Sequence, residues 1–119
     1  MKRPEGDKER LEHISECCDN ILASCKGVGI DEFMNNLVLR TACAKWLEII
    51  GEASNHITDD FRTTNSHIEW SKIIGMRNIL VHEYFGIDYP AIWNVILLKV
   101  EELKIEVDKL LDGLIKNGE

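Results

Sequence analysis

The chain has 119 residues, 45% of them hydrophobic and 29% charged, which is typical of one globular domain over residues 1–119 and not of a disordered protein. No apolar run approaches the ~18 residues of a membrane span, and the charged first residues do not resemble a secretory signal, so we expect a cytoplasmic protein. The formal net charge of −7 disfavours broad electrostatic binding of long nucleic acid, so any action on RNA must rest on a local site.

The first predicted element is an amphipathic helix from about Asp7 to Lys26. Its apolar residues recur at steps of three and four, which places them on one helix face: Leu11, Ile14, Cys18, Ile21, Cys25 and Val28. Gly27 and Gly29 follow these residues and supply the turn that ends the helix.

The second predicted helix has Asp31 as its N-cap and runs to about Ile57. Its apolar stripe, which begins at Phe33, is wide, so we expect other elements to cover this helix on more than one side. Residues 58–65 are polar and turn-prone, and they can hold one extra short helical turn.

The third predicted helix begins near Ser66. Ser66 and Glu69 are three residues apart, which fits a capping box in which each side chain bonds a backbone amide of the other. We expect this helix to extend to about His82 or Tyr84.

The last predicted helix is capped by Asp88, with Pro90 tolerated in its first turn. The apolar residues that follow alternate steps of four and three, as in a long bundle helix: Tyr89, Trp93, Ile96, Val100, Leu103, Val107, Leu110 and Leu114. The sequence shows no strand-like alternation. We therefore predict an all-α fold, an antiparallel bundle of four main helices.

The third helix carries two apolar faces on a helical wheel. One is a normal core face, formed by Ile73, Met76, Ile79 and Leu80. Trp70, Ile74 and Val81 lie on a second face, close to Arg77. Because a four-helix bundle covers only one of these faces well, we predict a homodimer in which a second copy covers the other.

The four cysteines, Cys17, Cys18, Cys25 and Cys43, form no Cys-x-x-Cys motif. We expect them to be small buried thiols in a reducing compartment. His13 and Cys17 are four residues apart and could share a helix face as metal ligands, but two ligands do not make a zinc site. No second pair has such a spacing, so we predict neither a metal nor a cofactor.

Arg77 and His82 are the candidate catalytic residues. An arginine is always charged and can hold a phosphate through a two-pronged hydrogen bond. A histidine titrates near neutrality and can transfer protons. Cleavage of RNA by attack of its own 2′-hydroxyl needs these two functions and no metal. On a helix, however, the two residues lie about 140° apart. Their spacing alone also fits a histidine that is partly buried and hydrogen-bonded to a neighbour.

The segment Arg77-Asn78-x3-His82-x-Tyr84 resembles the HEPN signature, in the extended Arg-x4-His-x-Tyr form of the HepT toxins. Glu83 stands where aspartate is common in that family. The resemblance extends over nearly the whole chain and rests on further segments: Asp7-x-x-Arg10-Leu11, Glu32-Phe33, Ile49-Ile50-Gly51-Glu52-Ala53, Ile68-Glu69-Trp70, Gly75-Met76 and Phe85-Gly86-Ile87-Asp88 with Trp93.

This resemblance implies the toxin of a type VII-like HEPN/MNT toxin–antitoxin system. Such a protein is a homodimeric, metal-independent endoribonuclease, with Arg77 and His82 catalytic and Asn78 supporting them. The implied partner is an MntA-like minimal nucleotidyltransferase, an antitoxin that silences the toxin by attaching AMP to Tyr84. Without this resemblance, the sequence would favour a simpler interpretation of Tyr84, an aromatic residue at a helix end with its hydroxyl in water.

A second interpretation is a non-catalytic helical module that docks a minimal nucleotidyltransferase and helps to position its substrate. The acidic net charge and the single motif histidine per chain favour this alternative. The intact set of Arg77, Asn78, His82 and Tyr84 favours the enzyme.

Overall fold

The computed structural model describes residues 6–82 and 86–116, with the side chains of residues 77–82 outside the description. Within these ranges the chain forms helices and no strand. The long elements are α1 (Asp7–Ser24), α3 (Leu37–Asn55), α5 (Trp70–His82) and a last helix composed of α6 (Tyr89–Val95), the π-helical turn η1 (Ile96–Val100) and α7 (Glu101–Lys116). Two short helices lie in the connections: α2 (Ile30–Asn35) and α4 (Asp59–Thr64).

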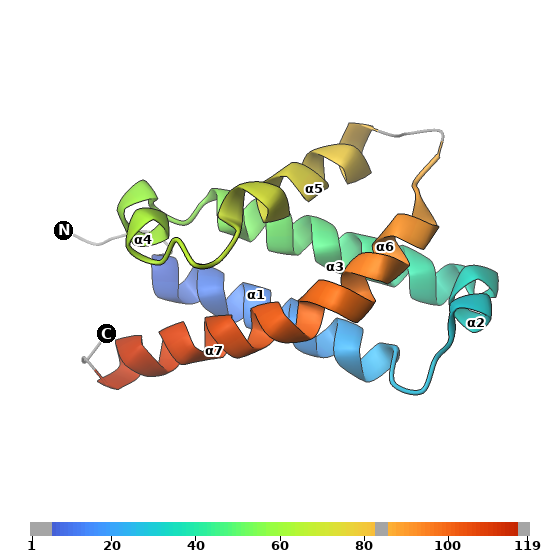
Figure 1. Ribbon diagram of the computed structural model, residues 1–119, viewed down its shortest axis with the longest axis horizontal. Coiled ribbons are helices and arrows are strands. Elements are labelled where there is room, and N and C mark those ends of the chain that lie inside the picture. The colour runs from blue at the N-terminus through green and yellow to red at the C-terminus, as the bar shows by residue number, and fades with distance from the viewer. Residues whose placement is uncertain (1–5, 83–85, 117–119) are drawn as a thin grey trace.

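The four long elements run in alternating directions along the molecule (Figure 1). Helix α1 packs between α3 and the last helix, and α5 packs on α3. This arrangement confirms the predicted all-α, antiparallel bundle of four main helices. No helix in the described ranges combines the length and the apolar character that crossing a bilayer requires.

The core lies where α1, α3 and the last helix meet. Most of the apolar stripe predicted for the first helix is buried, and every member of the last helix's stripe is buried or half-buried. Phe33 of α2 is fully buried, and its ring lies 4.8 Å from the ring of Trp93, centroid to centroid. This aromatic pair fixes α2 against the last helix.

The predicted second helix is wrong in two respects, the first of which is an interruption at Asn36. This residue has an extended backbone, and its side-chain oxygen accepts a hydrogen bond from the amide of Leu39 at 3.0 Å. Asparagine competes for backbone hydrogen bonds in this way, so it ends α2 and caps α3. The N-cap of α2 is Gly29, and the predicted cap Asp31 lies inside the helix.

The predicted start of the third helix is also wrong, since α5 begins at Trp70 and not near Ser66. The carbonyl of Glu69 accepts hydrogen bonds from the amides three and four residues later, those of Lys72 and Ile73. The Ile68 amide instead bonds the carbonyl of Asn65, in a turn that buries the Ile68 side chain. The burial of the Ile68 side chain therefore outweighs the capping box that Ser66 and Glu69 could form.

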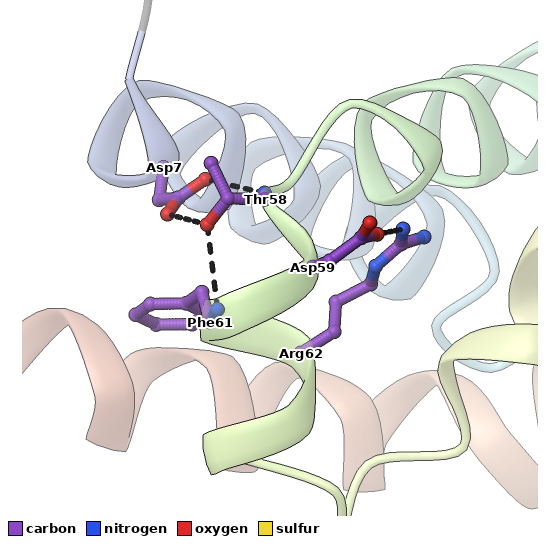
Figure 2. Close-up of polar contacts among 5 residues, drawn as sticks. All are labelled: Asp7, Thr58, Asp59, Phe61 and Arg62. Carbon is purple, nitrogen blue, oxygen red and sulfur yellow. Dashed lines mark hydrogen bonds and ion pairs between the residues drawn. The ribbon is translucent and has the colours of Figure 1, made fainter.

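The extra short helical turn predicted after the second helix is present as α4. Its N-cap is Thr58, whose hydroxyl accepts a hydrogen bond from the amide of Phe61 (Figure 2). The Thr58 hydroxyl and amide both donate to the carboxylate of Asp7, at 2.7 and 2.9 Å. These bonds tie the start of α1 to the start of α4.

The last helix begins as predicted. The Asp88 carboxylate accepts a hydrogen bond from the amide of Ala91, and Pro90 occupies the first turn of α6. The helix then passes through the π-helical turn η1, which leaves Leu97 and Leu98 60% and 69% exposed.

Candidate functional site

Helix α5 carries the predicted catalytic residues Arg77 and His82 and the supporting residue Asn78. Its backbone is helical through His82. A regular helix separates Arg77 from His82 by about 7.5 Å along the axis and about 140° around it. The three side chains lie outside the described residues, as does Tyr84, so these assignments stay predictions.

The second apolar face predicted for this helix is partly wrong. Trp70 was expected there, but it is 6% exposed and belongs to the core. Its indole N–H donates to the carbonyl of Asn65 at 3.0 Å, which holds the ring over the turn before α5. Ile74 is half-buried, and the side chain of Val81 lies outside the described residues. Trp70 is buried because it lies at the start of α5, where the preceding turn covers it.

A cavity of about 740 Å³ lies between α3, α5 and the last helix. In Figure 1, α5 follows α3 and stands away from the last helix along this side. The cavity wall is mainly apolar and is contributed by all three elements: Leu47, Ile50, Ile73, Met76, Val95, Val100 and Leu103. Sequence reasoning missed this cavity because its wall comes from residues far apart in the chain.

Paired charges border the cavity. Lys72 donates a hydrogen bond to Glu69 at 2.8 Å, and Lys99 of η1 reaches the same carboxylate at 3.7 Å. The hydrogen bond and charge of Lys72, with a smaller contribution from Lys99, hold the pKa of the Glu69 carboxyl below its usual range. His67 lies 3.2 Å from Glu106 of α7. Because the Glu69 carboxylate already engages Lys72 and Lys99, the border is a poor phosphate site.

The start of α6 is fixed to α3 by Arg40. Its guanidinium lies over the ring of Tyr89, 4.9 Å from the centroid, and also donates to the carbonyl of Met34. The cation–π contact and the hydrogen bond join α2, α3 and α6 at one point. Arg40 therefore has a structural role at the end of the bundle where α5 stops.

The two metal ligands considered in the sequence have different environments. His13 is exposed on α1, whereas Cys17 is buried in the same helix. Among the described residues, no group of three or more His, Cys, Asp and Glu side chains is arranged to hold a metal ion.

Comparison with known proteins gives one family. The family model described as "Ribonuclease HepT-like" matches residues 14–110, a range that includes all of α5. A Caldanaerobacter subterraneus subsp. tengcongensis protein named "Putative RNase TTE0752" is 40% identical over 111 residues, which are 93% of this chain and 96% of that protein.

Two further relatives agree with this match. "Putative RNase MJ1380" of Methanocaldococcus jannaschii is 41% identical over 101 residues, 85% of this chain and 93% of its own. "Probable ribonuclease HepT" of Thermococcus cleftensis is 34% identical over 110 residues, 92% of this chain and 98% of its own. No solved structure matches the chain.

Proposed function

Because the chain belongs to the HepT-like ribonuclease family, we propose that it is an endoribonuclease, the toxin of a type VII-like HEPN/MNT toxin–antitoxin system. The family match over residues 14–110 carries the proposal, since it spans the motif helix and most of the bundle. The continuous α5 backbone supports it, because Arg77 and His82 then hold a fixed spacing on one rigid element.

In the proposed mechanism, the nucleophile is the 2′-hydroxyl of the substrate. His82 takes the proton from that hydroxyl or gives one to the leaving 5′-oxygen. Arg77 stabilises the negative charge that builds on the phosphoryl oxygens, through its planar two-pronged donor. Asn78 supports the pair by hydrogen bonding, and the products are a 2′,3′-cyclic phosphate and a 5′-hydroxyl.

The proposed active form is a homodimer. One motif histidine per chain leaves the mechanism short of a second proton-transfer group, and a symmetric dimer brings two. The exposed Leu98 supports this proposal. It lies four residues before Glu102, which borders the cavity, so it is on the side of the last helix near α5. A second copy covering this side would bury apolar surface that the single chain leaves in water.

The proposed partner is an MntA-like minimal nucleotidyltransferase, the antitoxin, which silences the enzyme by attaching AMP to Tyr84. Tyr84 comes two residues after His82 in the sequence, so the added phosphate would be expected near the helix that carries Arg77. A negative phosphate next to that arginine would compete with the RNA phosphate for it. The test is the intact mass of the protein before and after incubation with the transferase and ATP.

The alternative is a non-catalytic module that docks a nucleotidyltransferase. The net charge of −7 favours it, because an acidic surface repels RNA. An assay of the unmodified protein on RNA separates the two functions. The enzyme should cleave equally with and without EDTA, leave 2′,3′-cyclic phosphate ends, and fail on a substrate with a 2′-deoxy nucleotide at the cut. A binding module should leave every RNA intact.

A further inference from the structure

Two of the four cysteines meet although they belong to different helices. Cys25 is the C-cap residue of α1, and Cys43 lies in α3. Their sulfur atoms are 3.6 Å apart, within the range of an S–H···S hydrogen bond. All four cysteines are free thiols, and Cys17 and Cys18 lie further back along α1. The close pair therefore joins the C-terminal end of α1 to α3, two of the elements that build the core.

The two thiols differ in access. Cys43 is 0% exposed, whereas Cys25 is half-buried and lines a small surface cavity of about 240 Å³. Lys26, Leu97 and Glu101 also line that cavity. Cys25 is thus the residue of the pair that a small oxidant can meet from the surface, whereas Cys43 is enclosed.

We propose that Cys25 and Cys43 form a dithiol modification site that a hydroperoxide closes to an intramolecular disulfide. The Cys25 thiolate attacks one peroxide oxygen, the O–O bond breaks, and an alcohol or water leaves, which converts Cys25 to a sulfenic acid. The Cys43 sulfur then attacks the Cys25 sulfur, the S–O bond breaks, and water leaves. Both sulfurs are oxidised and the peroxide is reduced; a dithiol reductant reverses the reaction.

The environment of the pair sets the order of these steps. Burial raises the pKa of the Cys43 thiol to about 12, with a further contribution from Cys25. Burial also raises the pKa of the Cys25 thiol, but the hydrogen bond with Cys43 opposes that increase. Cys25 is therefore the sulfur that forms the attacking thiolate, and Cys43 is the sulfur that resolves the sulfenic acid.

The disulfide would close a loop that contains α2 and the turn before it. Its two ends, the last turn of α1 and the body of α3, already contact each other, so the link would hold the bundle in its present arrangement. Cross-linking residues 25 and 43 also restricts the unfolded chain, which stabilises the folded state. Thermal stability is therefore a second readout that needs no ribonuclease activity. Its outcome is independent of the proposed function.

The experiment treats the whole protein with hydrogen peroxide, alkylates it under denaturing conditions and measures its intact mass. We expect two of the four thiols to escape alkylation. Digestion with trypsin and Asp-N should then give residues 19–26 linked to residues 41–45, a peptide pair that excludes Cys17 and Cys18. The melting temperature should rise by roughly 5–10 °C and fall again with dithiothreitol.

Variants identify the order of the two sulfurs. In Cys43→Ala, oxidation should stop at a sulfenic acid on Cys25, which dimedone labels. In Cys25→Ala, the three remaining thiols should stay reduced. Cys17→Ala, a buried cysteine of the same helix, is the matched control and should still form the link. Four reactive thiols after peroxide treatment would overturn the proposal. So would a link through Cys17 or Cys18, a disulfide between two chains, or a sulfinic acid on Cys25 with no link.

Discussion

The contact between Asp7 and Thr58 gives a stability prediction that can be worked from the structure. One carboxylate accepts two hydrogen bonds, from the amide and the hydroxyl of Thr58, at 2.9 and 2.7 Å, and the same hydroxyl caps α4 (Figure 2). Asp7→Ala removes both bonds. At about 0.5–1.5 kcal/mol for each exposed bond, the loss in unfolding free energy is about 1–3 kcal/mol.

Thr58→Ala should cost a similar amount, since it removes one of these bonds and the cap, which is worth about 1 kcal/mol. The assay is a double-mutant cycle by urea denaturation, and the double variant should lose about 1 kcal/mol less than the sum of the single variants. Glu12→Ala, an exposed acid of the same helix, is the matched control. Strict additivity of the two single changes would refute the claim that these residues act through each other.

Three further predictions concern activity, assembly and acid stability. His82→Ala and Arg77→Ala should each lower RNA cleavage by about 10²–10⁴-fold, measured at equal protein concentration; His13→Ala on α1 should leave it unchanged. Leu98→Glu should shift the homodimer toward monomer in light scattering, whereas Ile115→Glu, an equally apolar and exposed position at the far end of α7, should not. Burial opposes ionisation of Asp108, but hydrogen bonds from Lys104 and Ser15 prevail and lower its pKa. The stabilisation is therefore present above the unfolded-state pKa of about 4 and is lost as the pH falls through the lower folded-state pKa. The melting temperature should therefore fall less between pH 6 and pH 2 in Asp108→Asn than in the unmodified protein.

Each of these outcomes can go the other way. Full cleavage by His82→Ala would remove the histidine from the mechanism even if the protein remains a ribonuclease. An unchanged dimer in Leu98→Glu would move the interface away from this side of the last helix. If the melting temperature of Asp108→Asn falls with pH as much as that of the unmodified protein, the loss of stability in acid belongs to other carboxylates.

Much of the fold could be predicted because long stretches of the sequence have a clear period. The stripe in the first helix and the alternating steps in the last helix each report which face is buried, and the core confirms them. The cap of the last helix at Asp88 could be predicted because a side chain and an amide three residues away are enough to form it.

The errors arose where tertiary contacts decide local structure. Asn36 interrupts an apolar stripe that has no glycine or proline to mark a break. Ser66 and Glu69 satisfy a local capping rule, but burial of Ile68 shifts the start of α5 by four residues. A helical wheel predicts an outer position for Trp70 because it takes no account of the chain before the helix, which covers this first residue of α5.

The candidate site was predictable in part for a different reason. Arg77 and His82 have the chemistry that RNA cleavage needs and lie in a segment that resembles a family motif, and the family match confirms that resemblance. Their catalytic roles stay predictions. The pair of Cys25 and Cys43 could not be seen in the sequence, because the two residues are 18 positions apart and only the packing of α1 on α3 brings their thiols together.

The π-helical turn η1 decides where the last helix tolerates a change in length. A π-helical turn holds one more residue than an α-helical turn, so the segment Ile96–Val100 accommodates a residue that an uninterrupted helix would have to leave out. Deleting one residue there would restore a regular helix and keep Trp93 and Val107 facing the core. Deleting one residue within α7 would instead rotate all that follows by about 100° and turn its apolar stripe toward water. Loss of a single residue is therefore tolerated at this turn and destabilising elsewhere in the helix.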